Sequence, residues 1–528
     1  MAHFSQLSIG LIIKSTKIWS WQHDLVQSLI TKQLIRVSQV HVIASDPPEL
    51  PRSIAILHKL DSMVFQSVMT AFKVVELDLS SVQKGSYSES SDGEGVDLWI
   101  NLSERMVDNE LSKTARLGLL GSHFSESSCG CETNSANFGY FEFSRREKQC
   151  YFSVVLQHPN GSKYVLSESR PSLDKGSLSR NMNQYWGLLE ASWVRVCQQL
   201  QMSTVGSIPN NKVLIKNADR FECPEFSSFQ AYQNLILVLL EKITQKFFRK
   251  EQWVLLLHFR DQSVNEEIPL SFADYQKIMP PKDCFWADPF IVTKDGRHYV
   301  FFEELPYTTE CGHLSCLEVF ADGSHSEPRV ILKKPYHLSY PNVFSHDGNY
   351  YMVPESGDAG LITLYRCKAF PYEWEQERVL IDNLHAYDTT LLEYQGKWWL
   401  FACVAAEVGM SGNEELHIFY ADSLFSEIWE PHLLNPVISD ASRARPAGQF
   451  FEREGELYRP SQDCAGSYGA GLNINRIKVL DKENYDEELI HCARPDWDPK
   501  LTALHTLNFN QHLVVADAMS IDGRFFSK

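Results

Sequence analysis

The C-terminal half of the chain repeats one sequence pattern five times, and this repeat constrains the fold more than any other feature. Each copy begins with a small polar or proline-containing segment, forms a hydrophobic strand, turns at a glycine or polar residue and ends in a second strand. The copies recur about every fifty residues, the period of propeller blades built from four short strands. They are ADPFIVTKDGRHYVFFEE from Ala287, YPNVFSHDGNYYMVPES from Tyr340, YDTTLLEYQGKWWLFACV from Tyr387, RPAGQFFEREGELYRPSQD from Arg445 and LHTLNFNQHLVVADAM from Leu504.

The repeat predicts an all-β five-bladed β-propeller over residues 285–528. The Asp-Gly and Gln-Gly dipeptides inside the copies mark hairpin turns, where a left-handed backbone suits glycine. The first strand of every propeller blade lines the central channel, so the residues that start the copies converge on one pocket. We expect the function to lie in that pocket.

The N-terminal part reads differently, because short β-rich runs alternate with helical ones. This pattern predicts an α/β domain over residues 1–201, with a polar, Ser-rich surface insertion at Lys84–Gly95. A linker and bridging helix follow over residues 202–284, with the helix at Ser227–Lys250.

Composition limits the partners and the compartment. The 528 residues include 49 basic and 67 acidic side chains, a net charge of -18, which disfavours nucleic acid or an anionic membrane surface as the main partner. We expect a small-molecule substrate, a cytoplasmic location without a membrane span, and no cofactor or metal, since the sequence carries neither a phosphate-binding glycine loop nor paired zinc-ligand motifs. The oligomeric state stays open.

Three carboxylates are candidates for acid and base chemistry in the pocket. Asp288 and Asp388 lie on first strands, and Glu355 ends a second strand. The alternative is that the aspartates cap turns and Glu355 pairs with an arginine. With His505, these three are the predicted catalytic residues, and the predicted substrate-binding residues are Tyr340, Asn342, Arg443, Arg445, Arg459, Gln462, Asp463 and Tyr468.

Two arginines suggest a clamp for an oxygen-rich ligand. The segment Arg459–Asp463 is unusually polar for a second strand, and Arg459 together with Arg445 would bind such a ligand in bidentate fashion. A structural salt bridge between Arg459 and Asp463 is the alternative.

The propeller motifs resemble those of the domain at the N-terminus of plant glucosamine inositolphosphorylceramide transferases and, more distantly, five-bladed glycosidases. By the glycosidase resemblance, Asp288 would be the catalytic base, Asp388 the modulator of a pKa and Glu355 the acid. In the plant transferases, transfer belongs to a separate glycosyltransferase domain, which we do not find in this chain. The resemblance covers about Phe285 to Asp517 and is carried by FWADPF, HLSYPNVF, MVPES, YDTTLLEYQGKWWLF, ARPAGQFF and LYRPSQDCAGSYG.

The N-terminal segment, over about residues 7–200, is similar to the formyltransferase fold. Gly121-Ser-His123 stands where a formyltransferase carries Asn-x-His, and the catalytic Asp would fall near Asn160-Gly161, where an amide cannot act as a base. The resemblance therefore implies lost catalytic residues, a structural role for His123, and a domain that serves as scaffold or pocket wall.

The whole layout resembles the fungal hetero-Diels-Alderases of tropolone-sesquiterpenoid biosynthesis. That resemblance implies a secondary-metabolism enzyme that joins a tropolone quinone methide to a sesquiterpene such as a humulene derivative, by positioning rather than acid-base chemistry. Arg445 and His505 would then hold the tropolone oxygens. The implied aromatic walls are Trp286, Tyr340, Trp398 and Tyr468.

The cycloaddition is our first hypothesis, and two alternatives stay open. One is an enzyme that hydrolyses or transfers a sugar with the propeller carboxylates. The other is a non-catalytic binding module, which would expose a broad apolar patch instead of a deep central pocket.

Overall fold

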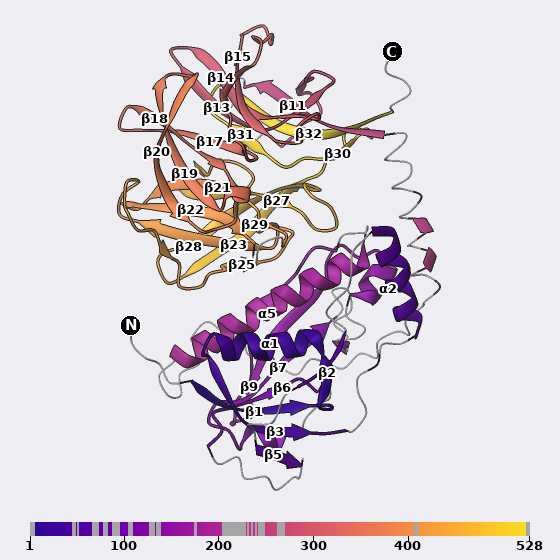
Figure 1. Cartoon of the computed structure of the whole chain (residues 1–528). Helices are drawn as coiled ribbons and strands as arrows, with labels where there is room; N and C mark the ends of the chain where they lie inside the picture. Colours follow the sequence, from indigo (N-terminus) through magenta and orange to yellow (C-terminus); the bar gives the residue numbers. More distant parts are fainter. Residues whose placement is uncertain are drawn as a thin grey trace. The chain divides into compact units, whose positions relative to one another are not determined.

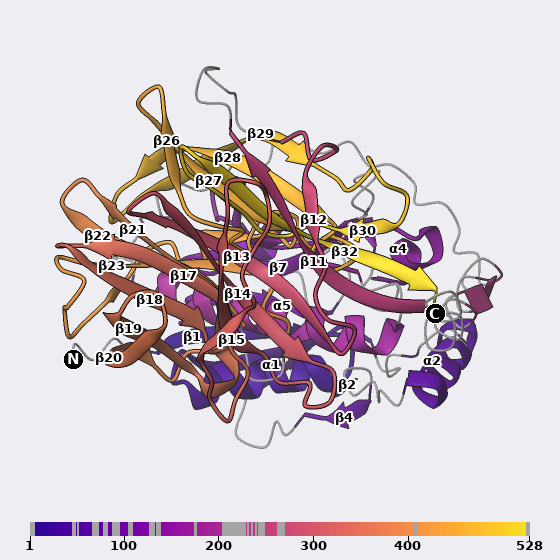
Figure 2. The same cartoon turned by 90° about the horizontal axis from the view of Figure 1, so that it is seen from above.

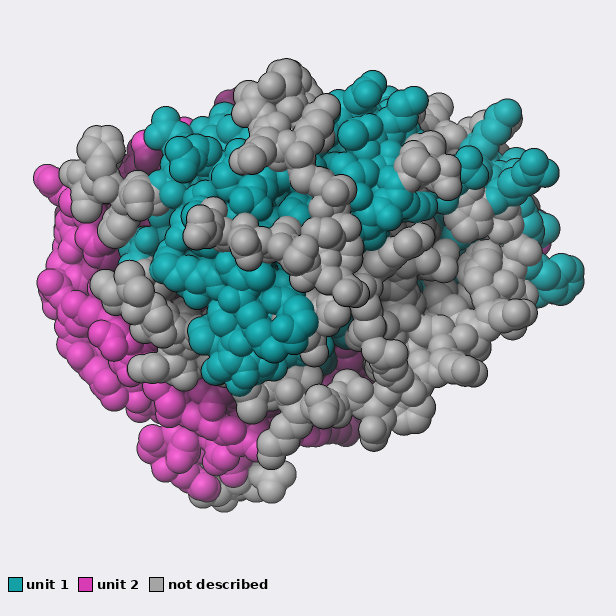
Figure 3. Space-filling model, turned by 90° about the horizontal axis from the view of Figure 1, so that it is seen from below, with its two compact units in different colours: residues 1–238 teal, residues 239–528 magenta. Residues whose placement is uncertain are grey.

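The computed structural model divides the chain into two compact units, residues 1–238 and 239–528 (Figure 3). The structure describes residues 6–44, 49, 52–65, 73–77, 83–86, 95–103, 109–125, 132–133, 139–173, 177–202, 229, 232–233, 236–237, 240, 249–260, 270–405 and 410–523.

The first unit is built on a mixed sheet in the order β10-β9-β7-β6-β1-β3-β5, with β8 paired to β7. The strands from β5 to β7 pair in parallel, and β9 and β10 continue the sheet antiparallel. This confirms the predicted α/β class. The strands are β1 (Leu7–Ile13), β3 (Ile35–Val42), β5 (Gln83–Ser86), β6 (Leu98–Asn101), β7 (Gly118–Ser125), β8 (Glu132–Thr133), β9 (Tyr151–Gln157) and β10 (Lys163–Ser169); β2 (Lys17–Trp19) and β4 (Val74–Glu76) form a separate two-stranded antiparallel sheet.

The helices of this unit are held by a buried cap and an aromatic stack. Asp61 accepts hydrogen bonds from the first backbone N–H groups of α5, at Leu178 and Ser179, over 3.1 and 2.9 Å, where a carboxylate also favours the helix dipole. Trp21 of α1 stacks on Trp186 of α5 at 4.4 Å. Among the described helices, none is long and apolar enough to cross a membrane. The helices are α1 (Ser20–Thr31), α2 (Arg52–Phe65), α3 (Asn109–Ser112), α4 (Tyr140–Arg145) and α5 (Leu178–Met202).

The motifs predicted in this unit have mixed outcomes. His123 lies half-buried on β7, and Asn160-Gly161 form the exposed turn between β9 and β10. The predicted surface insertion is shorter than expected, because Lys84–Ser86 form part of the edge strand β5, and residues 87–94 lie outside the described residues. The formyltransferase identity stays a prediction.

The second unit is a five-bladed β-propeller, as the repeat predicted (Figure 2). Four blades are consecutive four-stranded units, and the fifth combines strands from both ends of the unit. The consecutive blades are β13 (Cys284–Lys294), β14 (Arg297–Pro306), β15 (His313–Val319), β16 (Arg329–Leu332); β17 (Ser339–His346), β18 (Asn349–Glu355), β19 (Leu361–Ala369), β20 (Glu373–Asp382); β21 (Ala386–Tyr394), β22 (Lys397–Val404), β23 (Glu415–Ala421), β24 (Glu430–Pro431) with β25 (Ile438–Ser439); and β26 (Phe451–Arg453), β27 (Glu456–Asp463), β28 (Gly471–Leu480), β29 (Tyr485–Ala493).

The fifth blade closes the ring. Its strand β11 (Arg249–Phe259) lies beside β32 (Leu513–Gly523) and pairs with it antiparallel over its whole length (Figure 1). The strands β12 (Gln276–Ile278), β30 (Leu501–Ala503) and β31 (Leu507–Phe509) complete this blade. Such closure leaves no unpaired edge between the first and last blades.

This closure corrects the predicted domain boundary. We placed residues 202–284 in a linker and bridging helix, but β11 and β12 belong to the propeller. The helix is present at the described positions 229, 232–233, 236–237 and 240, whereas Arg249 and Lys250, its predicted end, lie in β11. The repeat did not reveal β11, because this strand is the third of its blade and carries none of the first-strand motif.

Three inner strands carry a bulge at the same place. The pairing register shifts between Ala287 and Phe290, between Ser339 and Asn342, and between Tyr387 and Thr390. At these bulges, Asp288, Tyr340 and Asp388 adopt left-handed φ angles of 54°, 45° and 51°. A bulge redirects a side chain, and a left-handed tyrosine is strained, so the surrounding structure must hold it.

Removing side-chain volume from the closing strand tests the importance of ring closure. Leu256 on β11 is 1% exposed, so Leu256→Ala should lower the free energy of unfolding of the propeller by about 2–5 kcal/mol. Val330→Ala on β16, at a side chain that is 57% exposed, is the control and should change it by less than about 0.5 kcal/mol. Urea unfolding followed by tryptophan fluorescence measures both, and equal midpoints for the two variants would contradict this role of β11.

Candidate active site

Five side chains from five blades meet where the inner strands begin. All five are buried, and each occupies the equivalent position at the start of its copy of the repeat. The sequence analysis named all five, and the contacts between blades described below bring them together. They are Asp288, Tyr340, Asp388, Arg445 and His505.

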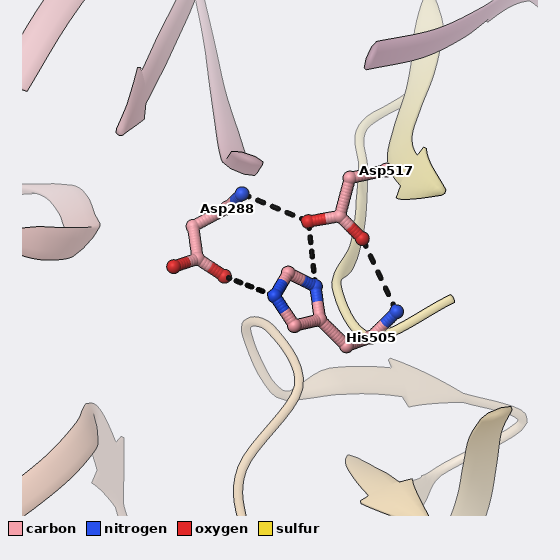
Figure 4. Close-up of side chains that lie close together, drawn as sticks. All are labelled: Asp288, His505 and Asp517. Atoms are coloured by element: carbon pink, nitrogen blue, oxygen red, sulfur yellow. Dashed lines mark hydrogen bonds and ion pairs between the residues drawn. The ribbon is translucent and has the colours of Figure 1, made fainter. Parts of the chain in front are cut away.

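One half of the cluster is a histidine between two aspartates (Figure 4). The Nδ1 atom of His505 lies 2.7 Å from Oδ2 of Asp517, and its Nε2 atom lies 3.7 Å from Oδ1 of Asp288. The backbone N–H of Asp288 donates to the same oxygen of Asp517 over 2.8 Å, and the Thr506 hydroxyl donates to Asp288 over 2.7 Å. These contacts join the first blade to the closing blade.

The surroundings raise both pKa values in this half. Burial raises the pKa of Asp288 to about 7, assisted by the charges of Asp388 and Asp517, while His505 opposes the shift. Burial disfavours charge on His505, but Asp517 and Asp288 outweigh it and raise its pKa to about 9. Asp288 therefore exchanges its proton near neutral pH beside an imidazolium.

The same three residues lie close enough together to be considered as metal ligands. One ligand atom from each of Asp288, His505 and Asp517 lies within 4.8 Å of the other two. However, both Asp517 oxygens are already occupied, Oδ2 by Asp288 N and the imidazole and Oδ1 by the backbone N–H groups of His505 and Thr506. A cation would have to displace this network, so these residues fit a hydrogen-bonded triad better than a metal site.

The other half of the cluster is Arg445 between two carboxylates. Its Nε donates to Asp388 over 2.6 Å, and its Nη2 lies 3.3 Å from both Asp388 and Glu355. Gln462 adds a donor to Asp388 over 2.6 Å. Asp388 is thus held in one position by two donors at short range.

Glu355 is the carboxyl with the raised pKa in this half. Burial raises its pKa well above the usual range, the charge of Asp388 adds to the shift, and Arg445 opposes it. A buried carboxyl with a raised pKa beside a second carboxyl is the arrangement from which a general acid is made. The predicted pairing of Glu355 with an arginine is present as well, since Arg445 contacts it.

Aromatic rings border the charged cluster. Tyr468 packs edge-on against His505 at 5.4 Å, and the Arg445 guanidinium lies 5.1 Å from its ring centre. Tyr387 faces Arg445 at 5.3 Å, and Trp253 stacks on His505 at 4.0 Å. Tyr468 is 42% exposed, whereas the charged side chains beside it are buried, so its ring lies on the solvent side of the cluster.

Three predicted substrate-binding residues, Arg443, Arg459 and Asp463, lie outside the charged cluster. Arg459 is 1% exposed and pairs with Glu487 over 2.8 Å, so neither the clamp with Arg445 nor the alternative salt bridge with Asp463 forms. Asp463 instead pairs with Arg494. Arg443 faces Asp440 at 3.7 Å with 39% of its side chain exposed. Arg459 and Asp463 lie on the face of β27 opposite to Gln462, because side chains on a strand alternate between the two faces of a blade. Arg443 lies in the turn that precedes the inner strand of its blade, so the structure corrects the prediction for all three residues.

Tyr340 and Asn342 are buried in the channel wall. The Tyr340 hydroxyl lies 2.9 Å from the Thr390 hydroxyl and accepts the N–H of Gly448 over 2.6 Å, which ties three blades together. Asn342 is 1% exposed, and its amide finds no hydrogen-bond partner among the described residues. An unpaired buried amide is costly to folding, and such groups concentrate at functional sites.

The predicted aromatic walls do not enclose one cavity. Trp286, Tyr340 and Trp398 are buried in three separate hydrophobic cores between blades. These side chains therefore fill space between blades. Tyr468 is the predicted wall residue that stands at the cluster.

Sequence reasoning missed the second-strand members of the cluster. Asp517 anchors His505, and Glu303 lies 3.2 Å from the imidazole of His337. In the strand register, Glu303 stands opposite Ala287, and Glu355 stands opposite Ser339. The two glutamates therefore hold equivalent positions in neighbouring blades. Comparing FFEE with VPES across the copies would have revealed Glu303.

A pocket of about 620 Å³ lies at the opposite end of the inner strands, where they approach their hairpin turns. Its lining includes Ile291, Val343 and Leu391, a few residues beyond the bulges, and none of the predicted catalytic residues. The charged cluster, not this pocket, is the candidate active site, because catalysis requires the titratable groups.

Comparison with known proteins agrees with the propeller assignment. Residues 270–496 match the family model of the N-terminal region of glucosamine inositolphosphorylceramide transferase 1. The enzyme of that name from Oryza sativa subsp. japonica is 39% identical over 206 residues, and that from Arabidopsis thaliana is 35% identical. The match covers 38% of this chain and 27% of each relative, so the chain matches about a quarter of their length.

Solved structures of glycosidases resemble part of this chain at low similarity. A family 117 glycoside hydrolase of Zobellia galactanivorans is 12% identical with a TM-score of 0.33, covering 52% of this chain and 90% of the hydrolase. The catalytic domain of an α-L-arabinofuranosidase from Coprinopsis cinerea is 15% identical with a TM-score of 0.34, covering 44% of this chain and 90% of that domain. Similarity at this level says nothing about activity.

The raised pKa of Asp288 predicts a pH-dependent effect of Asp288→Asn. Between about pH 4 and 6.5 the unfolded chain loses the Asp288 proton while the folded chain keeps it, so this residue costs stability increasingly as pH rises. The stability of Asp288→Asn relative to wild type should therefore increase over this range, by about 1.4 kcal/mol per pH unit at most. Asp347→Asn is the control, because Asp347 also has a left-handed φ but is exposed. Parallel pH profiles of unfolding for Asp288→Asn and wild type would contradict the shift.

The unpaired amide of Asn342 predicts a stabilising substitution. Asn342→Leu removes a buried polar group of similar size, so the free energy of unfolding should rise by about 1 kcal/mol. Asn473→Leu is the matched control and should lower it, because the Asn473 amide donates to Ser442 O over 2.7 Å. Thermal unfolding compares the two, and destabilisation of Asn342→Leu to the same extent as Asn473→Leu would refute the assignment.

Proposed function

We propose that the propeller acts on a carbohydrate at the charged cluster, by hydrolysis or transfer of a glycosyl group. The observation that carries the proposal is a pair of buried carboxyl groups that share Arg445, Asp388 and Glu355, of which Glu355 has a raised pKa; a third carboxyl, Asp288, has a pKa raised to about 7. The match of residues 270–496 to the N-terminal region of glucosamine inositolphosphorylceramide transferase 1 supports a carbohydrate-related substrate.

Glu355 serves as the general acid. It delivers its proton to the glycosidic oxygen as the bond from that oxygen to the anomeric carbon breaks. Asp388, fixed by Arg445 and Gln462, keeps the proton on Glu355 through its negative charge until the leaving group accepts it.

Asp288 serves as the general base. It takes a proton from the water or acceptor hydroxyl that attacks the anomeric carbon. Asp517 holds His505 in place, and the imidazolium stabilises the ionised form of Asp288. Ionised Asp288 is needed for this step, so the rate should rise with pH through about 7.

The substrate is proposed to contain an amino sugar. The relatives' name contains glucosamine and inositolphosphorylceramide, which we adopt as the first candidates for the donor sugar and the acceptor.

The cycloaddition hypothesis receives less support. It relied on an aromatic-walled cavity and on Arg445 and His505 as free hydrogen-bond donors, but both side chains pair with carboxylates and the walls lie in separate cores. A pure binding module is the remaining alternative, and activity measurements separate it from an enzyme.

Substitution of the acid and the base tests the proposal. Glu355→Gln and Asp288→Asn should each reduce kcat/KM for glucosaminides by about 10²–10⁴-fold, the usual contribution of one acid or base. Hydrolysis of aryl glucosaminides, and transfer to inositolphosphorylceramide in detergent, would be followed by mass spectrometry. Glu377→Gln is the control, because Glu377 is exposed on the outer strand β20 and lies in neither site. Equal activity of wild type and both cluster variants, or no turnover of any glucosaminide, would overturn the proposal.

A further inference from the structure

The pocket at the opposite end of the inner strands forms a second site, and we infer that it binds a neutral saccharide. This inference is independent of the proposed catalysis, because the pocket contains none of the residues assigned to acid-base chemistry.

All five blades contribute to this pocket, which is open to solvent. Its volume of about 620 Å³ lies within the range of small-molecule sites. Each blade supplies at least one polar residue, and these include Thr293, Ser345, Glu393 and Gln449, with Asn510, Gln511 and His512 from the closing blade.

Apolar side chains lie between these polar groups. Leu391 is buried at the floor, and Phe344 and Trp398 lie together with ring centres 5.7 Å apart. Aromatic and aliphatic surfaces of this kind bind the C–H faces of a sugar ring, while polar groups at fixed places bind its hydroxyls.

The polar groups favour a ligand that donates hydrogen bonds. The amide nitrogen of Gln449 already donates to Val343 O over 2.6 Å, which leaves its side-chain oxygen as an acceptor. The Glu393 carboxylate is a second acceptor, and neither lysine nor arginine occurs among the described residues that line the pocket. The ammonium at this wall, that of Lys294, lies over the rings of Tyr350 and Phe370, so no lysine or arginine of the described lining is offered to an anionic ligand such as a phosphate.

A cationic ligand is disfavoured as well. The Lys294 ammonium lies 5.4 Å from the ring centre of Tyr350, so a cation already occupies one face of this wall residue. Glu393 in turn faces the imidazole of His346 at 3.6 Å. With both charge types disfavoured, a neutral polyhydroxylated ligand fits the lining best.

Binding to the full chain tests this inference. Saturation-transfer NMR and calorimetry would use the neutral disaccharides cellobiose, lactose, maltose and sucrose, with choline and inorganic phosphate as charged probes. We expect at least one disaccharide to bind wild type and neither charged probe to compete with it. Failure of all four to bind, or competition by choline or phosphate, would overturn the inference.

Variants locate the binding. Gln449→Leu should weaken it by about three- to tenfold through the lost hydrogen bond, whereas Gln376→Leu on the exposed outer strand β20 should not. Ser345→Trp, which fills the pocket from an exposed position, should abolish it and leave the fold unchanged by circular dichroism. Glu355→Gln should leave binding unchanged even where it removes activity. Retention of binding by Ser345→Trp would place the sugar elsewhere and refute the second site.

Discussion

The pairing of β11 with β32 is the constraint on which the propeller and its charged cluster depend. It joins the first strand of the propeller unit to its last, and so fixes the closing blade beside the first blade. That placement brings His505 and Asp517 to Asp288, residues more than two hundred positions apart in the chain. A ring without this closure would leave Asp288 without its histidine and would open an unpaired sheet edge.

Burying so many ionisable groups is expensive, and the cluster offsets the cost by pairing each charge. Arg445 is shared by Asp388 and Glu355, and Asp517 accepts four hydrogen bonds or ion-pair contacts. Such fully paired networks hold side chains in one arrangement, which acid-base chemistry requires. The strained left-handed backbone of Tyr340 is held in the same way, through contacts of its hydroxyl with two other blades.

The propeller and the convergence of its five first-strand residues could be predicted, because the repeat places them at equivalent positions. The closing strand could not, since β11 precedes the repeats and shares no motif with them. The sequence also could not show which carboxylate forms an ion pair with Arg459. This side chain pairs with Glu487 on another strand of its blade, 28 positions away, rather than with the nearby Asp463. Sequence patterns give the strand on which a residue lies, but pairing across strands depends on register and on the face that each side chain takes.

The most direct test of the account is a crystal structure of the full chain with bound glucosamine. The account predicts the amino sugar at the charged cluster beneath Tyr468, with its hydroxyl and ammonium groups within hydrogen-bonding distance of Glu355, Asp388 and Asp288. Glucosamine bound away from these carboxylates, with the Arg445 and His505 pairs undisturbed, would contradict the assignment of the cluster as a carbohydrate-processing site.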